Sequence, residues 1–472
     1  MSRNKDLAKN TMILTFGRIC TQFVSFLLLP LYTAILEPEV YGIADLFNSY
    51  IYLIIPLVSL MLDQGLFRFL LECREDEKRK KTLLSTVLLI NCIEIIVYLL
   101  IYLVIQRFIG SQYKIFLFID VVINVFLNTL LQFARGVGKN GVYAISSFLS
   151  ASMTVVFNVI TLVFLRMGAW GLFISTVAGR FIALIVTIIL LKTWNYFEIK
   201  KFSKAEAKQL MNYSLPFIPN QLSWWIISVS DRTIISWFLN VAANGLYSVA
   251  NKFSSIYITF YNIFNLSWTE SVSLHINDKD SEKFLENTIN TMFKLFYAVC
   301  IGIIAYMPLV FPLLINEQYN QAYMQIPILM LAVLFQVIVG LYSVIYVALK
   351  KSTEIAKTSF WAAVINIGVD VALIKFIGLY AASISTLVAY ATMSIYRYFH
   401  IKKYVNVPLH RKGIYLFIAV IVCVFYYYNN AYMNIATALG VTVFAIVSNK
   451  EFIQDTIITI LTSIKNIKNK RG

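Results

Sequence analysis

Three basic residues lie inside long apolar stretches of the sequence: Arg18, Arg232 and Lys252. A cation at membrane depth is costly unless it faces a partner or a water-filled cavity. Guanidinium and ammonium groups are well suited to binding phosphate oxygens, although each cation has a structural alternative as the partner of a carboxylate. These residue types at these positions predict a cavity that holds an anion.

Each of the three cations belongs to a stripe of polar residues at helical spacing. Arg18, for example, is followed by Gln22 and Ser25, at steps of four and three residues, and this spacing places all three on one face of a helix. Any single stripe is also compatible with hydrogen bonding between helices. The full set that we predict to line the cavity is Arg18, Gln22, Ser25, Gln221, Ser228, Arg232, Lys252, Ser255 and Asn262.

Three carboxylates inside apolar segments are candidates for binding a coupling proton or sodium ion: Asp63, Asp231 and Asp370. Asp231 adjoins Arg232, so its alternative role is to tune the neighbouring charge. The five cysteines show no metal or redox spacing, and the three histidines offer no arrangement for nucleophilic catalysis. We therefore expect no catalytic residues, no metal site and no cofactor beyond a coupling ion.

Membrane-spanning helices are the elements that must position these side chains. Hydrophobic residues make up 59% of the 472 residues, and the mean hydropathy is +0.73, values that exceed those of soluble globular proteins. Apolar runs of about 20 residues recur from end to end, each long enough to cross the bilayer as a helix. We predict an all-α polytopic protein with about fourteen spans, near residues 11–36, 40–71, 82–106, 113–135, 141–165, 169–191, 213–239, 241–271, 288–314, 322–349, 357–377, 379–400, 411–429 and 431–449.

The net charge is +16, and the basic residues are concentrated in alternate loops of this predicted topology. With the amino terminus in the cytoplasm, 30 of the 40 Lys and Arg residues fall in cytoplasmic segments. This bias predicts that both termini are cytoplasmic, and the basic loops also favour contact with anionic membrane lipids. We find no nucleic-acid-binding module, and we expect no cleaved signal peptide.

Two internal similarities indicate a duplication. Tyr41–Phe47 matches Tyr247–Phe253 at an offset of 206 residues, and Gly168–Thr176 matches Gly378–Thr386 at an offset of 210. Either match alone is compatible with chance, but both at nearly one offset favour two six-helix repeats with the same orientation, as in transporters whose substrate site lies between the repeats. The predicted organisation is an amino-terminal half at 1–200, a carboxy-terminal half at 201–405, two further helices at 406–450 and a basic cytoplasmic tail at 451–472.

Several short motifs recur along the predicted helices and their loops: Ser214–Asn220, Ser223–Trp225, Ser230–Arg232, Asn244–Ala250, Leu29–Thr33 with Glu39–Gly42, and Phe133–Gly136 with Gly138–Asn140. These motifs resemble those of the bacterial polysaccharide flippase (Wzx-like) family, within the multidrug, oligosaccharidyl-lipid and polysaccharide exporter (MOP) superfamily. The resemblance implies the fourteen-helix fold of that family in the bacterial cytoplasmic (inner) membrane. It also implies movement of an undecaprenyl-pyrophosphate-linked oligosaccharide for O-antigen or capsule synthesis, by alternating access coupled to H⁺ or Na⁺.

The expected partners are the lipid-linked oligosaccharide, membrane lipids, and the polymerase and assembly proteins of a polysaccharide pathway. One alternative is a multidrug exporter of the same superfamily, which would usually carry acidic residues for cationic drugs. A second alternative is a membrane glycosyltransferase or polymerase, for which Asp278-Lys279-Asp280 offers a metal-binding pattern. That pattern lies in a predicted loop of about fifteen residues, too short to house a nucleotide-binding domain, so we do not expect an enzyme.

Overall fold

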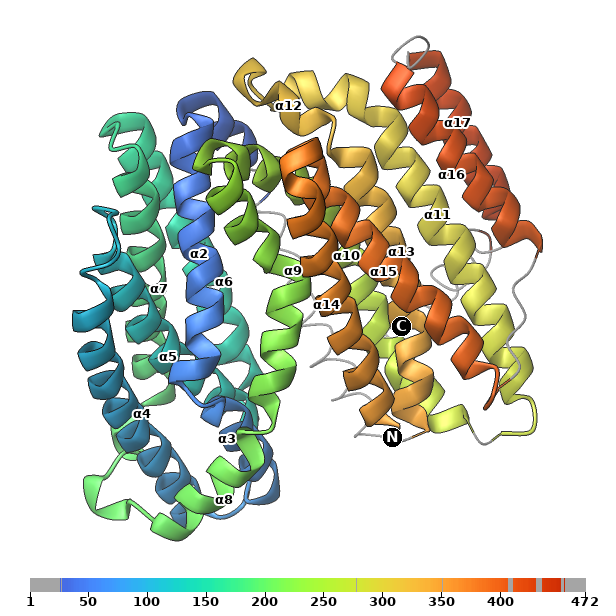
Figure 1. The fold of residues 1–472 in the computed structure, drawn as a ribbon. Coiled ribbons are helices and arrows are strands. Elements are labelled where there is room, and N and C mark those ends of the chain that lie inside the picture. Colours follow the sequence, from blue (N-terminus) through green and yellow to red (C-terminus); the bar gives the residue numbers. More distant parts are fainter. Residues whose placement is uncertain are drawn as a thin grey trace, which may run out of the picture. The chain divides into compact units, whose positions relative to one another are not determined.

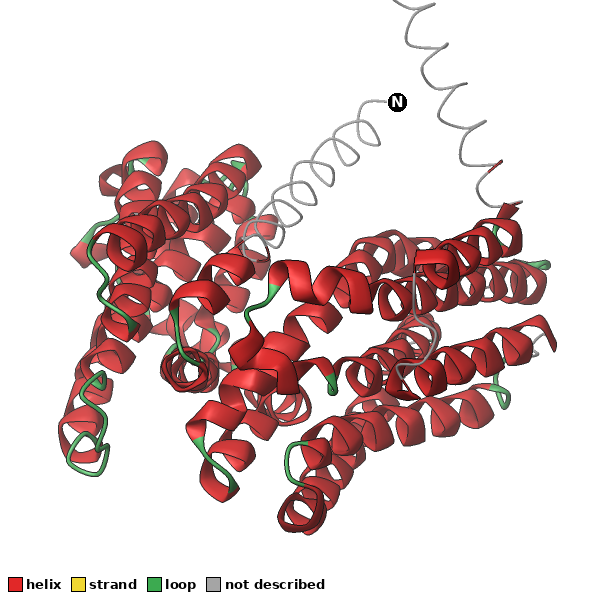
Figure 2. Ribbon diagram, turned by 90° about the horizontal axis from the view of Figure 1, so that it is seen from above, coloured by secondary structure: helices red, strands yellow, loops and turns green. Residues whose placement is uncertain are grey.

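The computed structural model describes residues 26, 28–276, 278–349, 351–405, 411–429, 435–450 and 454. Every regular element in this part of the chain is a helix (Figure 2), which confirms the predicted all-α class. Eight of the described helices are long and apolar enough to cross a membrane, so the protein is a multi-pass membrane protein. The count of about fourteen spans stays a prediction, because the first predicted helix, 11–36, lies largely outside the described residues.

The chain forms two compact units, Met1–Ser248 and Val249–Gly472, which are described separately below. The boundary between them falls within one long helix, α10 (Val241–His275). The duplication predicts a different division, after residue 200, because it divides the chain into two sequence repeats. That organisation stays a prediction.

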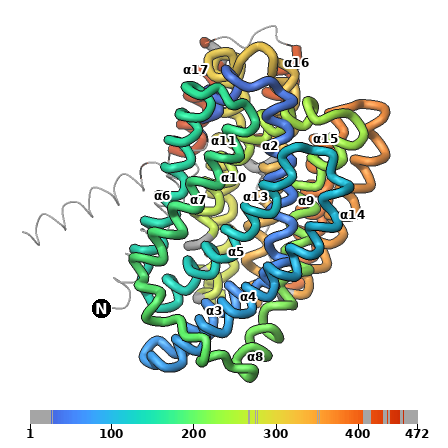
Figure 3. The backbone as a smooth tube through the Cα atoms, turned by 90° about the vertical axis from the view of Figure 1, so that its left-hand side faces the viewer, coloured from blue at the N-terminus to red at the C-terminus, as the bar shows by residue number. Residues whose placement is uncertain are grey.

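The first unit is a bundle of antiparallel helices joined by short loops (Figure 1). Its helices are α2 (Pro38–Val58), α3 (Leu62–Glu72), α4 (Glu77–Ile105), α5 (Ile115–Gly136), α6 (Asn140–Asn158), α7 (Ala169–Leu191), α8 (Lys204–Ser214), α9 (Phe217–Phe238) and the first turns of α10. A π-helical stretch, Val159–Phe164, continues α6. Helices α6 and α7 pack along one another (Figure 3), and α5 contacts α3, α4 and α7.

The segment predicted as one helix over 40–71 is broken in the structure. Helix α2 ends at Val58, two residues after Pro56, and α3 begins at Leu62. Between them, Leu60 and Met61 both have left-handed backbone conformations, with φ of 47° and 55°. Such conformations are costly for residues with a Cβ atom, so the helix cannot continue through this point.

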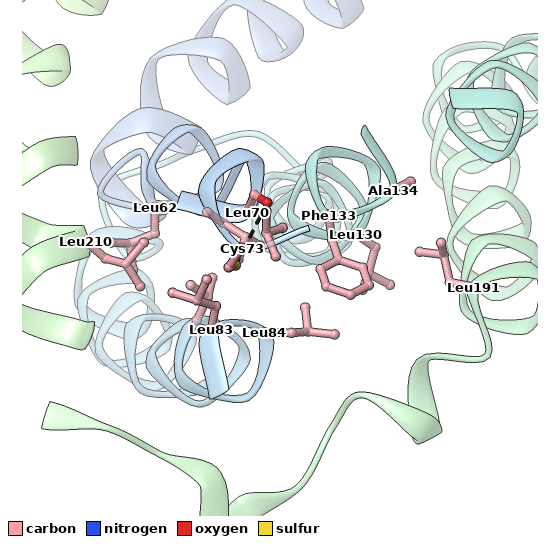
Figure 4. Packing of buried hydrophobic residues seen from close by; sticks show 12 residues of the cluster. Leu62, Leu70, Cys73, Leu83, Leu84, Leu130, Phe133, Ala134, Leu191 and Leu210 are labelled. Atoms are coloured by element: carbon pink, nitrogen blue, oxygen red, sulfur yellow. Dashed lines mark hydrogen bonds between the residues drawn. The ribbon is translucent and has the colours of Figure 1, made fainter. Parts of the chain in front are cut away.

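An apolar cluster ties α3, α4 and α5 together (Figure 4). Its fully buried members include Leu62, Leu66, Leu70, Leu83, Leu84, Leu130 and Phe133. The space is tight, because a Cβ atom on Gly136 would come within 2.6 Å of the Leu70 side chain. Close packing of this kind is what holds helices together where lipid removes most of the hydrophobic driving force.

The second unit contains two helix groups. Helices α13 (Ile326–Ala348), α14 (Ser352–Ile377) and α15 (Tyr380–Ile401) pack as one group. Helix α11 (Ser281–Leu314) contacts α13 and also carries α16 (Arg411–Asn429) and α17 (Ile435–Ser448). The short helix α12 (Asn320–Tyr323) precedes α13. The two helices that lie outside the duplication therefore pack against α11, with Tyr306 and Thr442 joined by a hydrogen bond of 2.9 Å.

Each unit contains the same glycine turn at the positions that the duplication pairs. Gly168, before α7, has φ 56° and ψ −132°, and Gly378, between α14 and α15, has φ 57° and ψ −133°. This region of backbone space is nearly exclusive to glycine. The agreement supports the duplication through local geometry, independently of side-chain similarity.

A buried arginine, Arg397 on α15, connects the helices of the second unit. It is 1% exposed, and it donates to the Thr358 hydroxyl of α14 at 2.6 and 3.0 Å. It also donates to the Ser343 hydroxyl and the Val339 carbonyl of α13. No described carboxylate lies within ion-pair distance of this guanidinium, so neutral oxygens alone satisfy its donors.

Replacing Arg397 with methionine is expected to lower the thermal stability of the purified protein. The change removes hydrogen bonds from a charged donor, each worth about 1.5–3 kcal/mol, and leaves the Thr358 and Ser343 hydroxyl oxygens without that donor. Thermal unfolding in detergent measures the effect, with Lys403→Met as a matched control because Lys403 is exposed. Equal melting temperatures for the two variants would show that Arg397 does not hold these helices together.

Candidate functional site

The amino-terminal turns of α2 and α10 cross in very close contact. A Cβ atom on Gly42 would overlap the carbonyl oxygen of Val241, and one on Gly245 would overlap the carbonyl oxygen of Pro38. The Asn244 amide, which is fully buried, donates to the Gly42 carbonyl at 2.9 Å. Two glycines thus allow backbone-to-backbone contact between the amino-terminal turns of α2 and α10.

One turn beyond this crossing, Asp45 of α2 accepts hydrogen bonds from two other helices. The Nε atom of Arg232, on α9, lies 2.7 Å from its Oδ2 atom. The Ser248 hydroxyl of α10 donates to the same oxygen. Both side chains of the ion pair are partly buried, with 14% of Arg232 and 17% of Asp45 exposed. We call Asp45, Arg232 and Ser248 the charged cluster.

Two further contacts hold α9 beside the charged cluster. The Trp225 indole donates to the Ser49 carbonyl of α2 at 2.8 Å. The buried Asp231, the neighbour of Arg232 on α9, accepts from the Tyr247 hydroxyl of α10 at 2.7 Å. Because these contacts fix the rotation of α9, the Arg232 side chain is directed towards α2.

The guanidinium of Arg232 keeps part of its hydrogen-bonding capacity. Its Nε atom binds Asp45 and its Nη1 atom donates to the Ser228 carbonyl at 3.1 Å. Its Nη2 atom has no hydrogen-bond partner among the described residues. A guanidinium that is held through Nε still has N–H donors on its Nη2 atom. Those donors are suited to binding an anionic oxygen.

The other predicted cavity residues are distributed between the two units and the undescribed segment. Gln221 and Ser228 are exposed on α9, in the first unit. Lys252, Ser255 and Asn262 lie on α10 in the second unit, where the Ser255 hydroxyl donates to its own helix at Asn251. Arg18, Gln22 and Ser25 lie outside the described residues. The structure thus assigns Arg232 a specific set of neighbours, and the joint cavity stays a prediction.

The three predicted ion-coupling carboxylates lie on three different helices, α3, α9 and α14. Asp63 stands in the first turn of α3, where it accepts from Gln64 at 2.7 Å. Asp231 is held by Tyr247, and Asp370 is fully buried on α14 in the second unit. Among the described residues, no group of three or more His, Cys, Asp and Glu side chains is placed to hold a metal ion.

Two intramembrane cations have carboxylate partners. Arg180 of α7 pairs with Asp120 of α5, and the Asn124 amide also donates to Asp120 at 3.1 Å. Arg68 pairs with Glu72 at 2.9 Å, near the end of α3, where both side chains are about half exposed. Each of these cations is paired with a carboxylate on a neighbouring turn or helix. We therefore interpret both ion pairs as structural contacts.

Sequence reasoning missed three residues of this region. Asp45 belongs to a polar stripe of α2, but its role as the partner of Arg232 was not predicted, and neither Trp225 nor Tyr247 was assigned a contact. The pairing of Asp45 with Arg232 could have been predicted from charge balance, because a partly buried arginine favours a nearby carboxylate.

These observations define a multi-pass, all-helical membrane protein with a partly buried ion pair where α2, α9 and α10 meet. The fold resembles those of two solved transport proteins of low sequence identity. It resembles the lipid II flippase MurJ in an inward closed conformation, with a TM-score of 0.67 and 16% identity, over 95% of this chain and 100% of that one. It also resembles an inward-facing multidrug resistance transporter of the MATE family, with a TM-score of 0.66 and 14% identity, over 82% of this chain and 98% of that one.

The sequence identifies the family more closely than the fold does. Residues 7–269 match the family of polysaccharide biosynthesis proteins. Because this match covers more than half of the chain, the protein belongs to that family. No curated protein sequence matches the chain significantly.

Proposed function

We propose that this protein moves an undecaprenyl-pyrophosphate-linked oligosaccharide across the bacterial cytoplasmic membrane for surface polysaccharide synthesis. Transport proceeds by alternating access and is coupled to an ion gradient, and both termini are cytoplasmic. The family assignment supports a role in polysaccharide synthesis, and the fold supports a transporter or flippase. Flipping of a lipid-linked sugar requires no bond chemistry, in agreement with the expectation that the chain is not an enzyme.

One observation carries the choice of an anionic substrate: Arg232 is partly buried and has an Nη2 atom with no described partner. The pyrophosphate of the lipid-linked sugar is a group that such a donor binds well. Lys252 supports the same choice, because it follows Ser248 by four residues on α10, a spacing that keeps both on one helix face. A multidrug exporter is the alternative, and a cation at this position disfavours its cationic substrates.

Deletion of the gene is expected to cause the lipid-linked oligosaccharide to accumulate in the membrane while surface polysaccharide falls. Mass analysis of extracted membrane lipids measures the accumulation and identifies the sugar. The plasmid-borne gene should reverse both effects. Unchanged lipid-linked sugars, together with increased retention of cationic dyes by the deletion strain, would support the multidrug alternative instead.

A further inference from the structure

A carboxyl group that the function above does not use lies near the middle of α4. The Glu94 side chain is 9% exposed, and its Oε1 atom is buried with no hydrogen-bond partner among the described residues. The basic residues of α4 are Lys78, Arg79, Lys80 and Lys81, which lie about four turns from Glu94. Of these, Arg79 pairs with Glu206 and Lys80 pairs with Glu77. A buried carboxyl with no cation beside it favours its neutral, protonated form.

The Asn91 amide connects Glu94 to α5. Its nitrogen donates to Glu94 Oε2 at 3.1 Å and to the Val87 carbonyl at 3.3 Å, and its oxygen accepts from the Thr129 hydroxyl of α5 at 2.8 Å. With the amide turned over, its oxygen would face two acceptors, Glu94 Oε2 and the Val87 carbonyl.

Among the described residues, the Asn91 amide is the one hydrogen-bond donor to Glu94, and the Oε1 atom has no partner. One hydrogen bond offsets little of the cost of burying a charged carboxylate. These contacts leave the ionised form of Glu94 poorly stabilised.

The surroundings of Glu94 favour a proton over a metal ion. On α3 the facing ionisable group is Asp63, which interacts electrostatically with Glu94. On α4 itself, Tyr98 lies one turn further along and donates to the Leu117 carbonyl, and the facing group on α5 is the non-ionisable Thr129. The Thr129 hydroxyl is already engaged by Asn91, which leaves too few oxygens for a coordination shell.

The backbone break between α2 and α3 adjoins this carboxyl pair. Met61, with φ 55°, lies two residues before Asp63, and α2 also carries Asp45 of the charged cluster. Left-handed residues with side chains are costly and persist where the surroundings hold them.

We propose that Glu94 is the site that binds and releases the proton coupled to transport. An O–H bond forms at Glu94 Oε2 when the proton enters from water on one side of the membrane. The same bond breaks when the proton leaves to water on the other side. The site is distinct from Asp63, Asp231 and Asp370, and its coupling role rests on the proposed function.

Infrared difference spectroscopy of the purified full-length protein tests the site without a transport assay. A carbonyl band from a protonated carboxylic acid is expected to disappear as the pH rises, in the native protein and in Glu77→Gln. Glu77 is the matched control because it is an exposed carboxyl on the same helix. The Glu94→Gln variant should lack this band, and Thr129→Val should shift it, which provides a second test should Glu94→Gln not fold.

Retention of the full titrating band in Glu94→Gln would overturn the proposal. Loss of the band on adding sodium chloride at constant pH, but not choline chloride, would also overturn it and identify a sodium site. In proteoliposomes, the Glu94→Gln variant should exchange substrate at the native rate when no pH gradient is present. The factor by which a pH gradient stimulates its transport should be at least tenfold smaller than in the native protein. Failure of the native protein to transport the lipid would count against the proposed function, whereas the infrared result is independent of that outcome.

Discussion

Replacing Arg232 with glutamine is expected to reduce polysaccharide export by about ten- to a hundredfold while the protein remains in the membrane. The estimate corresponds to about 1.5–3 kcal/mol for hydrogen bonds from a charged donor to the pyrophosphate. Asp45 keeps its bond from Ser248 in this variant, so the three-helix contact is only partly lost. Export is measured as surface polysaccharide per unit of membrane protein.

The double variant Asp45→Asn, Arg232→Gln separates anion binding from structural pairing. The pair is partly buried and joins residues 187 positions apart, so Asp45→Asn alone leaves a cation without its carboxylate and is expected to lower protein abundance. Neutralising both partners removes that penalty, and abundance should recover. Export should stay low in the double variant because the cation is still missing. Recovery of export would show that Arg232 serves only to match Asp45.

Replacing Gly245 with alanine is expected to prevent stable folding of the first unit. The new Cβ atom would overlap the Pro38 carbonyl oxygen, and it would lie 2.8 Å from the Pro38 carbonyl carbon and 3.1 Å from the Gly42 nitrogen. Overpacking typically costs about 1–3 kcal/mol, and these neighbours are backbone atoms that cannot rotate away. Membrane abundance and size-exclusion behaviour in detergent provide the measurement.

Gly302→Ala is the matched control for Gly245→Ala. Gly302 also lies inside a helix, α11, but a Cβ atom there would meet no heavy atom within 4 Å. Alanine favours the helix by about 1 kcal/mol relative to glycine, so this variant should be at least as abundant as the native protein. Equal abundance of the two variants would contradict the close crossing of α2 and α10.

The sequence patterns predicted the helices well, because apolar length and charge placement largely determine which segments span a membrane. On α2, Asp45 and the Ser49 carbonyl both contact α9, and their spacing of four residues places them on one helix face. The break at Leu60 and Met61 was missed. Pro56 was its only local signal, and the left-handed residues after it carry no sequence signature.

The contacts of the candidate site were harder to predict than its residues. Arg232 was selected from its position in an apolar segment, whereas its pairing with Asp45 depends on how α2 and α9 pack. Glu94 was overlooked although it is a single carboxylate within an apolar helix, a pattern that itself indicates function. Its importance became visible only through Asn91 and Thr129, which belong to different helices.

The central claim is tested most directly with purified protein reconstituted into vesicles that contain the lipid-linked oligosaccharide extracted from the deletion strain. Oxidation by external periodate, which does not cross the bilayer, measures how much of the sugar faces outward. Periodate should modify nearly all of the lipid in vesicles that contain the protein, but only the outward-facing fraction in protein-free vesicles and in those with the Arg232→Gln variant. The same accessible fraction with and without the protein would contradict the assignment as a flippase of lipid-linked sugars.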